Sequence, residues 1–423
     1  MMTLAQITMV LTLFLMILGK TPLYLTAIIG SAITALIAGF PITGKEEITI
    51  TKMINAGLNP VIADMAGVLM FIGIMQATGF LDVIIRDIIR IGKRIGGGPG
   101  VAAAGGIAAG CIGALTGFTQ PAIMAVITGA ASVRLGVDPN KAAGVHGHAG
   151  HLGNLGGFTH PTQVAILAAA GLSFGMFNVY GAIIALSVFL ASFLRLKREE
   201  KAKGNQMSPE EMDRHLAEIN NKTYKAGSLV AFAPFVVLVV GFVLGFPIFL
   251  VGVASAIVAM ILGKEDSKTG ESNMMAGVGK IATPLVATIG FLFLSTVIRN
   301  IGLVKIISDA INPVLSVAPV QIMLLVAALT ATMTQSYAAS AAIILPFLQV
   351  VLNTGASPIA SGLAAAAGGA LMQYFLTGGP VAALATVIPV IPNTDLKTAN
   401  RFQRPSIIFG LLAALIVTTL VNL

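Results

Sequence analysis

The sequence has 423 residues, of which 56% are hydrophobic and only 10% are charged, and its mean hydropathy is +0.92. Soluble domains carry about 25% charged residues, so this composition excludes a soluble enzyme and indicates a polytopic membrane protein whose apolar surface faces lipid. The formal net charge of +8 is explained by cytoplasmic loops rich in Lys and Arg, and we expect no nucleic-acid partner.

Apolar stretches along the chain predict membrane-spanning helices. In chain order they cover 3–19, 23–40, 57–80, 139–172, 174–194, 226–245, 247–263, 279–298, 358–392 and 405–422.

Two further stretches, 101–135 and 320–352, are interrupted by polar residues near their middle. Each arm of about 15 residues would extend only about 22 Å as a helix, whereas the bilayer core is about 30 Å thick. We interpret both stretches as re-entrant helical hairpins. Stretches 139–172 and 358–392 contain Gly and Pro at mid-length, and we interpret them as broken helices.

A polar segment, 195–225, separates residues 1–194 from residues 226–423. It is predicted to be a cytoplasmic linker with a short surface helix that starts near Ser208. Five crossings precede the cytoplasmic linker and five follow it. Both termini are therefore expected on the outer side of the inner membrane, opposite the linker. Nearly all Lys and Arg residues then lie inside, which agrees with the positive-inside rule; the exceptions are Lys45, Lys52, Arg299 and Lys305.

The two halves resemble each other in sequence. Pro139, Gly150 and Pro161 align with Pro358, Gly369 and Pro380 at one constant offset. Because each half has five crossings, an odd number, the halves are predicted to be inverted in the membrane. The predicted fold class is therefore all-α, with two inverted repeats of five crossings, re-entrant hairpins and broken helices, as in secondary transporters.

The four interruptions supply the candidate substrate-binding residues. Helix ends at such breaks leave backbone N–H groups unpaired, and these attract anions. The candidates are the hydroxyl, amide, aromatic and Gly residues of the breaks: Thr116, Gly117, Phe118, Thr119, Gln120, Gly157, Thr159, His160, Thr162, Ser336, Tyr337, Ser340, Thr377, Gly378 and Gly379.

Charged side chains are absent from all four breaks. Asp64 is the one acidic residue within a predicted helix, and it lies near the end of that helix. A cation-only exchanger normally keeps a carboxylate inside the membrane. The sequence therefore favours an anionic or neutral substrate.

Four of the five histidines, His146, His148, His151 and His160, lie in one broken helix. Histidine titrates near neutral pH, and an ionisable group inside the membrane is a candidate functional residue. The candidate coupling-ion residues are His160, His148, His151, Asn154 and Gln373. A structural role, with neutral His hydrogen-bonded between helices, stays open for His146 and His148.

No cofactor and no metal site are expected. Cys111 is the only cysteine, and no carboxylate accompanies the histidines as a zinc ligand would. No Ser, His and acid converge as a catalytic group, so an enzyme is not expected either.

Several motifs resemble the ion transporter superfamily of citrate–cation symporters, gluconate permeases and dicarboxylate carriers. These are Gly79-Phe80-Leu81-Asp82 followed by basic residues, the turn Thr116–Pro121, Leu135–Pro139, and Gly156–Thr162 with its partner Thr377–Pro380. The resemblance implies a carboxylate substrate bound at hairpin tips and broken helices, and a homodimer. The Ser-Asn-Thr hairpin signature of the divalent-anion/sodium branch is missing, which favours H⁺ coupling.

The sequence therefore predicts a secondary active transporter of a small organic anion, a carboxylate, coupled to H⁺ or Na⁺. Two alternatives stay open: a Na⁺/H⁺ antiporter of the same superfamily, and a transporter of a zwitterionic amino acid. Besides the substrate, the expected partners are membrane lipid and a second copy of the chain.

Overall fold

A computed structural model describes residues 1–18, 21–55, 60–116, 121–203, 226–279, 282–306, 309, 315, 317–376 and 382–423. These residues form helices and turns, with no strand among them, so the predicted all-α class is confirmed. The helices are α1 Met2–Leu18, α2 Leu23–Ile37, α3 Ile50–Asn55, α4 Pro60–Ala77, α5 Phe80–Thr116, α6 Pro121–Met124, a π-helical turn Ala125–Gly129, α7 Ala130–Arg134, α8 Pro139–Gly147, α9 Ala149–Leu155, α10 Pro161–Ala169, α11 Met176–Lys203, α14 Ser228–Val243, α15 Ile248–Leu262, α16 Ser267–Val278, α17 Ala282–Asn300, α19 Pro319–Thr334, α20 Tyr337–Leu352, α21 Pro358–Met372, α22 Ala382–Val387 and α23 Leu396–Asn422.

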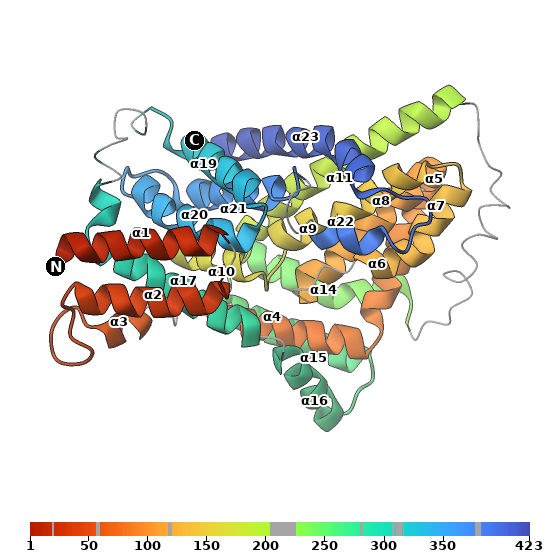
Figure 1. Cartoon of the computed structure of the whole chain (residues 1–423). Coiled ribbons are helices and arrows are strands. Elements are labelled where there is room, and N and C mark those ends of the chain that lie inside the picture. Colours follow the sequence, from red (N-terminus) through yellow and green to blue (C-terminus); the bar gives the residue numbers. More distant parts are fainter. Residues whose placement is uncertain are drawn as a thin grey trace.

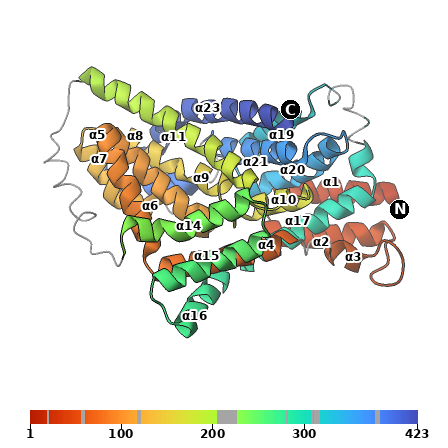
Figure 2. The same cartoon turned by 180° about the vertical axis from the view of Figure 1, so that it is seen from behind.

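Most helices lie side by side along one long axis, and α4 with α15 and α16 forms a layer at the bottom of the bundle (Figure 1). The N-terminus of α1 and the C-terminus of α23 lie at one end of the molecule. The C-terminal end of α11 lies at the opposite end, as the view from behind also shows (Figure 2).

The outer surface is apolar, as in a membrane protein. Large hydrophobic side chains such as Phe14 on α1, Val236 on α14 and Leu250 on α15 are more than half exposed. Three helical segments are long and apolar enough to cross a membrane: Phe80–Leu115, Met176–Glu199 and Leu396–Asn422. Nine shorter apolar helices accompany them among the described residues. The chain is a polytopic membrane protein.

Some elements differ in extent from the prediction. The α11 helix continues to Lys203, beyond the predicted end at residue 194, because Lys, Arg and Glu are good helix formers and need not stop a helix that leaves the membrane. Helix α23 begins at Leu396 instead of residue 405. Helices α3 and α16 were not predicted, since neither is apolar enough to read as a membrane span. The predicted surface helix near Ser208 lies outside the described residues.

The segment expected as the first hairpin is also more complex. Helix α5 begins at Phe80 and bends at Gly96 and Gly97, where the backbone leaves helical geometry. Gly97 has φ +53° and ψ −130°, a conformation open to glycine and strained for other residues. The second arm consists of α6, the π-helical turn and α7 instead of one uniform helix.

Helices α19 and α20 form the second hairpin around a short turn. Gln335 has a left-handed backbone, with φ +50°, and ends α19. Ser336 then caps α20, because its Oγ accepts a hydrogen bond from the Ala339 N–H at 3.2 Å. Helix α21 packs along both arms and is buried at every position from Ala360 to Met372.

Small residues allow helices to approach closely in the interior, as is usual in membranes. A Cβ atom on Gly368 of α21 would lie 2.6 Å from the Leu324 carbonyl of α19. A Cβ atom on Gly277 of α16 would lie 2.1 Å from the Leu69 carbonyl of α4. Asp64 also has a structural contact, because its carboxylate accepts the Phe249 N–H at the start of α15.

Candidate functional site

Helices α9 and α10 are separated by an extended segment that ends one helix at Leu155 and starts the next at Pro161. Proline at the first position of α10 suits a helix start, where no N–H partner is needed. Gly157 lies against backbone: a Cβ atom there would lie 2.1 Å from the Gly153 carbonyl. The Phe158 N–H donates to the Ala114 carbonyl of α5 at 2.9 Å.

Side-chain amides from α10, α11 and α23 donate to three backbone carbonyls at the breaks. Gln163 Nε2 donates to the Leu155 carbonyl at 2.9 Å, and Asn178 Nδ2 donates to the Gly157 carbonyl at 2.6 Å. At the end of α21, Asn400 Nδ2 donates to the Tyr374 carbonyl at 2.7 Å. These three bonds hold unwound backbone that would otherwise be costly inside a membrane.

The first broken helix meets the second hairpin through two aromatic rings. The imidazole of His160 stacks on the phenol ring of Tyr337, with 4.9 Å between ring centroids and 26° between planes. The Tyr337 N–H also donates to Oε1 of Gln373 at 3.1 Å. His160, Tyr337 and Gln373, one residue from each of three interruptions, therefore meet. Together with the polar sequence neighbours of His160 they form what we call the break cluster: Thr159, His160, Thr162, Gln163, Tyr337 and Gln373.

The break cluster is rich in buried polar atoms without a hydrogen-bond partner among the described residues. They are Thr159 Oγ1, His160 Nδ1, Thr162 Oγ1, Gln163 Oε1 and Tyr337 Oη. A native interior rarely leaves such groups unpaired, and each unpaired group costs about 1–3 kcal/mol. These five atoms, four at the first broken helix and one on Tyr337 of the second hairpin, are hydrogen-bonding groups that a polar ligand can use.

The two serines predicted in the second hairpin are used locally. Ser336 caps α20, and Ser340 Oγ donates to the Tyr337 carbonyl at 2.8 Å. Both hydroxyls shape the first turn of α20, and Ser340 is fully buried.

The remaining predicted residues belong to the first hairpin and the second broken helix. Thr116 is the last residue of α5. The others lie outside the described residues: Gly117, Phe118, Thr119, Gln120, Thr377, Gly378 and Gly379.

The other three histidines of the broken helix differ in their partners. His146 is satisfied at both ring nitrogens, by the Ala142 carbonyl and by Thr128 Oγ1, each at 2.8 Å. His148 Nε2 contacts Ser192 Oγ at 2.8 Å, and His151 Nδ1 lies 3.3 Å from the Ala370 carbonyl. None of these three side chains belongs to the break cluster.

Asn154, at the end of α9, donates from Nδ2 to Tyr374 Oη at 3.2 Å. Gln373 donates from Nε2 to the Ala370 carbonyl at 3.2 Å. In the part of the chain that the structure describes, no group of three His, Cys, Asp or Glu side chains forms a potential metal site.

The sequence reasoning did not single out Gln163, Asn178, Tyr374, Ser192 and Ser406, which all take part in buried hydrogen bonds. For Gln163 and Asn178 a signal was available. An amide side chain in an apolar membrane helix is costly unless it has a partner.

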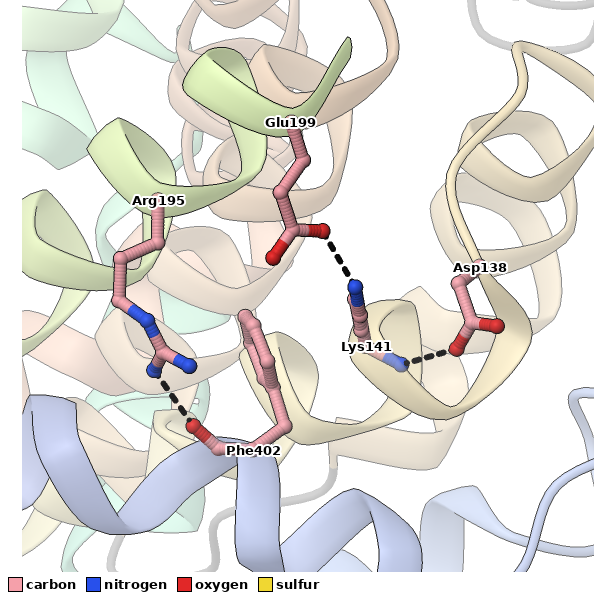
Figure 3. A network of polar contacts seen from close by, with 5 residues as sticks. All are labelled: Asp138, Lys141, Arg195, Glu199 and Phe402. Atoms are coloured by element: carbon pink, nitrogen blue, oxygen red, sulfur yellow. Dashed lines mark hydrogen bonds and ion pairs between the residues drawn. The ribbon is translucent and has the colours of Figure 1, made fainter. Parts of the chain in front are cut away.

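A charged network closes the end of the bundle where α11 emerges (Figure 3). Glu199 on α11 pairs with Lys141 on α8, and Asp138 caps α8 by accepting the Lys141 N–H at 3.1 Å. Arg195 donates to the Phe402 carbonyl at 2.7 Å, and its guanidinium lies 4.5 Å from the Phe402 ring centroid. The network ties α8, α11 and α23 together.

Known structures share this architecture. The YdaH transporter of Alcanivorax borkumensis is 15% identical, with a TM-score of 0.61 over 98% of this chain and 98% of that chain. MtrF of Neisseria gonorrhoeae, whose structure is described as illuminating a class of antimetabolite efflux pumps, is 15% identical, with a TM-score of 0.59 over 99% of this chain and 94% of that chain. No family model and no curated protein sequence matches the chain. The likeness shows that the chain has the fold of these proteins.

Proposed function

We propose that the protein is a secondary active transporter that moves a small organic anion, a carboxylate, across the inner membrane with H⁺ as the coupling ion. The observation that carries this proposal is the break cluster, with its five buried polar atoms that lack partners among the described residues. The shared fold of two transporters supports transport as the activity. The resemblance to citrate–cation symporters supports a carboxylate, and no cofactor is needed.

An anionic group suits the break cluster for electrostatic reasons. The helices α10 and α20 both begin there, at Pro161 and Tyr337, and a helix N-terminus carries partial positive charge. Thr159, Thr162 and Tyr337 add hydroxyl donors. No Asp or Glu belongs to the cluster, so it holds no negative charge that would repel a carboxylate.

H⁺ rather than Na⁺ is supported by the use of the exposed carbonyls. Broken-helix carbonyls coordinate Na⁺ in transporters that use it. Here the carbonyls of Leu155, Gly157 and Tyr374 already accept hydrogen bonds from amide side chains. His160, by contrast, is a titratable group within the cluster. Its Nδ1 is buried without a partner among the described residues.

The proposed orientation places both termini outside and segment 195–225 in the cytoplasm. It is supported by the positions of the two termini at one end of the bundle and of the α11 C-terminus at the other (Figure 1). The protein is proposed to act as a homodimer in the lipid bilayer, as the resemblance implies.

Uptake and efflux by purified protein in liposomes test this function. Labelled mono-, di- and tricarboxylates and amino acids are offered under separate H⁺ and Na⁺ gradients. Accumulation of a carboxylate driven by the H⁺ gradient is the expected result. Na⁺/H⁺ exchange without any organic substrate would select the antiporter, and accumulation of an amino acid would select the zwitterion transporter.

A matched pair of variants ties the activity to the break cluster. Thr162→Val removes a buried hydroxyl that has no partner among the described residues, and transport should fall about tenfold. Thr418→Val removes an equally buried hydroxyl that bonds within its own helix, to the Ala414 carbonyl, and transport should persist. Equal transport by both variants would place the site elsewhere.

A further inference from the structure

An apolar groove runs along the surface of the protein between α5 and α11, which lie side by side at the end of the bundle opposite the two termini (Figure 2). Its volume is about 340 Å³, which is within the range of sites that hold small molecules. Both arms of the bent helix α5 and one face of α11 form its walls, and each of its twelve lining residues is apolar or glycine. The groove therefore suits a hydrocarbon chain and not a polar solute.

Small residues on the floor of the groove and large residues on its rim give it this shape. A Cβ atom on Gly100 would collide with the Gly92 carbonyl, so the two arms of α5 touch through their backbones. On the rim, Ile91, Ile95 and Leu190 are each more than half exposed. Because α5 and α11 are both long and apolar enough to cross a membrane, these side chains meet hydrocarbon. The groove is therefore continuous with the lipid-facing surface.

One end of the groove carries a positive charge. Lys197 lies four residues beyond Phe193, the last lining residue of α11, and residues four apart share a helix face. Its Nζ lies 5.5 Å from the Phe193 ring centroid and donates to the Ile95 carbonyl of α5 at 3.2 Å. An ammonium group has three donors, so Lys197 can also bind an anion at this end of the groove.

The surroundings of Lys197 keep this end of the groove positive. Arg94 and Arg198 stand next in the sequence to Ile95 and Lys197, and both arginines are exposed. The carboxylate of Glu199, two residues beyond Lys197, is paired with an amine on α8. In the part of the chain that the structure describes, this end of the groove therefore has an excess of cations.

We propose that the groove binds an anionic phospholipid, with an acyl chain between α5 and α11 and the phosphate at Lys197. Basic groups between membrane helices at the membrane surface are typical of sites for acidic lipid headgroups. The acyl chain matches the apolar lining, and the phosphate matches the ammonium group. The lipid fastens both arms of α5 to α11, because all three form the walls.

Single-Trp fluorescence tests this site, because the sequence contains no Trp. Phe193→Trp places an indole in the groove beside Lys197. Phe409→Trp places one on an exposed position of α23, outside the groove. The full-length variants are reconstituted in bilayers of phosphatidylglycerol and phosphatidylethanolamine, in which one lipid or the other has brominated chains that quench the indole on contact. The ratio of the two quenching efficiencies gives the local lipid preference and cancels the depth of the ring.

The groove should prefer the anionic lipid. We expect a preference of about fivefold for phosphatidylglycerol in Phe193→Trp, the contribution of one basic residue at a membrane surface, and no preference in Phe409→Trp. Adding Lys197→Gln to Phe193→Trp should abolish the preference. Adding Lys268→Gln, which removes an exposed lysine of α16, is the matched control and should leave it unchanged.

A second pair of variants tests the position of the acyl chain. Ala103 lines the groove, and Ala103→Leu fills part of it, so quenching of the indole in Phe193→Trp by both lipids should fall. Ala254→Leu makes the same change at an exposed position of α15, outside the groove, and quenching should persist. Unchanged quenching in Ala103→Leu would show that no acyl chain occupies the groove.

Three other results would overturn the proposal. Equal quenching by the two lipids in Phe193→Trp would show ordinary bilayer contact without a site. No quenching by either lipid would show that protein covers the groove, as a second copy of the chain would. A preference that survives Lys197→Gln would exclude Lys197 as the phosphate ligand. Leu190→Trp, on the rim, is a second reporter should Phe193→Trp not fold.

This inference goes beyond the proposed function and does not depend on it. The fluorescence assay measures lipid contact at the groove, whereas the liposome assay measures transport through the break cluster. Lipid preference without carboxylate uptake would support the lipid site and contradict the proposed substrate. Carboxylate uptake without lipid preference would support the proposed substrate and contradict the lipid site.

Discussion

His160 and Tyr337 stack face to face, with 4.9 Å between ring centroids, although they belong to interruptions in opposite halves of the chain. His160 precedes the first residue of α10, and Tyr337 is the first residue of α20. The stack therefore brings two helix N-termini together in the interior. Conservative substitutions at His160 and Tyr337 should therefore change ligand binding while the protein still folds.

Tyr337→Phe keeps the stacked ring and removes the hydroxyl, which has no partner among the described residues. We expect substrate affinity to fall about tenfold, the value of one lost hydrogen bond, with the thermal unfolding temperature unchanged. Tyr337→Ala, which also removes the ring, should destabilise the protein by about 3 kcal/mol. Unchanged affinity in Tyr337→Phe would show that the hydroxyl does not contact substrate.

His160→Gln keeps a polar side chain but cannot take up a proton near neutral pH. We expect the variant to fold and to bind substrate with an affinity that no longer depends on pH, because the proposed function requires that carboxylate binding and protonation of His160 favour each other. Binding is measured between pH 5 and 8 (about the range in which histidine titrates). His215→Gln, in the polar linker of the sequence, is the control, and a wild-type pH profile in His160→Gln would exclude His160 as the coupling group.

Gly277→Ala should destabilise the packing of α16 on α4. A Cβ atom at Gly277 would lie 2.1 Å from the Leu69 carbonyl, and this contact with backbone has little room to relax. The expected loss is about 1–3 kcal/mol, seen as a lower unfolding temperature in detergent. Gly279→Ala, two residues along, meets no atom within 4 Å and should unfold like the wild type.

The network in Figure 3 should depend more on Arg195 than on Glu199. Glu199→Gln breaks a partly exposed ion pair with Lys141, and such pairs contribute about 0–1 kcal/mol. Arg195→Lys loses both the contact of the guanidinium with the Phe402 ring and the hydrogen bond to the Phe402 carbonyl, because an ammonium group does not reproduce the shape of a guanidinium. The unfolding temperature should therefore be lower in Arg195→Lys than in Glu199→Gln. A lower unfolding temperature in Glu199→Gln would contradict this account.

The proposed orientation is tested by reporter fusions. A reporter inserted at residue 210 should be active in the cytoplasm, and reporters at either terminus should be active outside, because most Lys and Arg residues then lie on the cytoplasmic side. Activity of an external reporter at residue 210 would reverse the orientation.

Local composition was sufficient to predict the membrane class and most helices. Hydropathy and helix-breaking residues act within a few turns, so the ends of α1, α2, α15 and α20 could be placed to within a few residues. Pro161 and the neighbouring glycines likewise marked the first broken helix, because proline cannot continue the hydrogen bonding of the preceding helix. Helix α16 is polar and gave no comparable signal, whereas the bend at Gly97 lies in the run Gly96-Gly97-Gly98-Pro99-Gly100, which does signal a break in a helix.

The sequence by itself determined an all-helical membrane protein with interrupted helices and a histidine-rich segment. The tertiary structure decided which interruptions meet: the stack of His160 on Tyr337 depends on the packing of α10 against α20. It also distinguished the histidines, since the partners of His146 and His148 come from Thr128 on the first hairpin and Ser192 on α11. Hydrogen bonds between distant segments form only when the helices are packed, so no local pattern in the sequence could assign these roles.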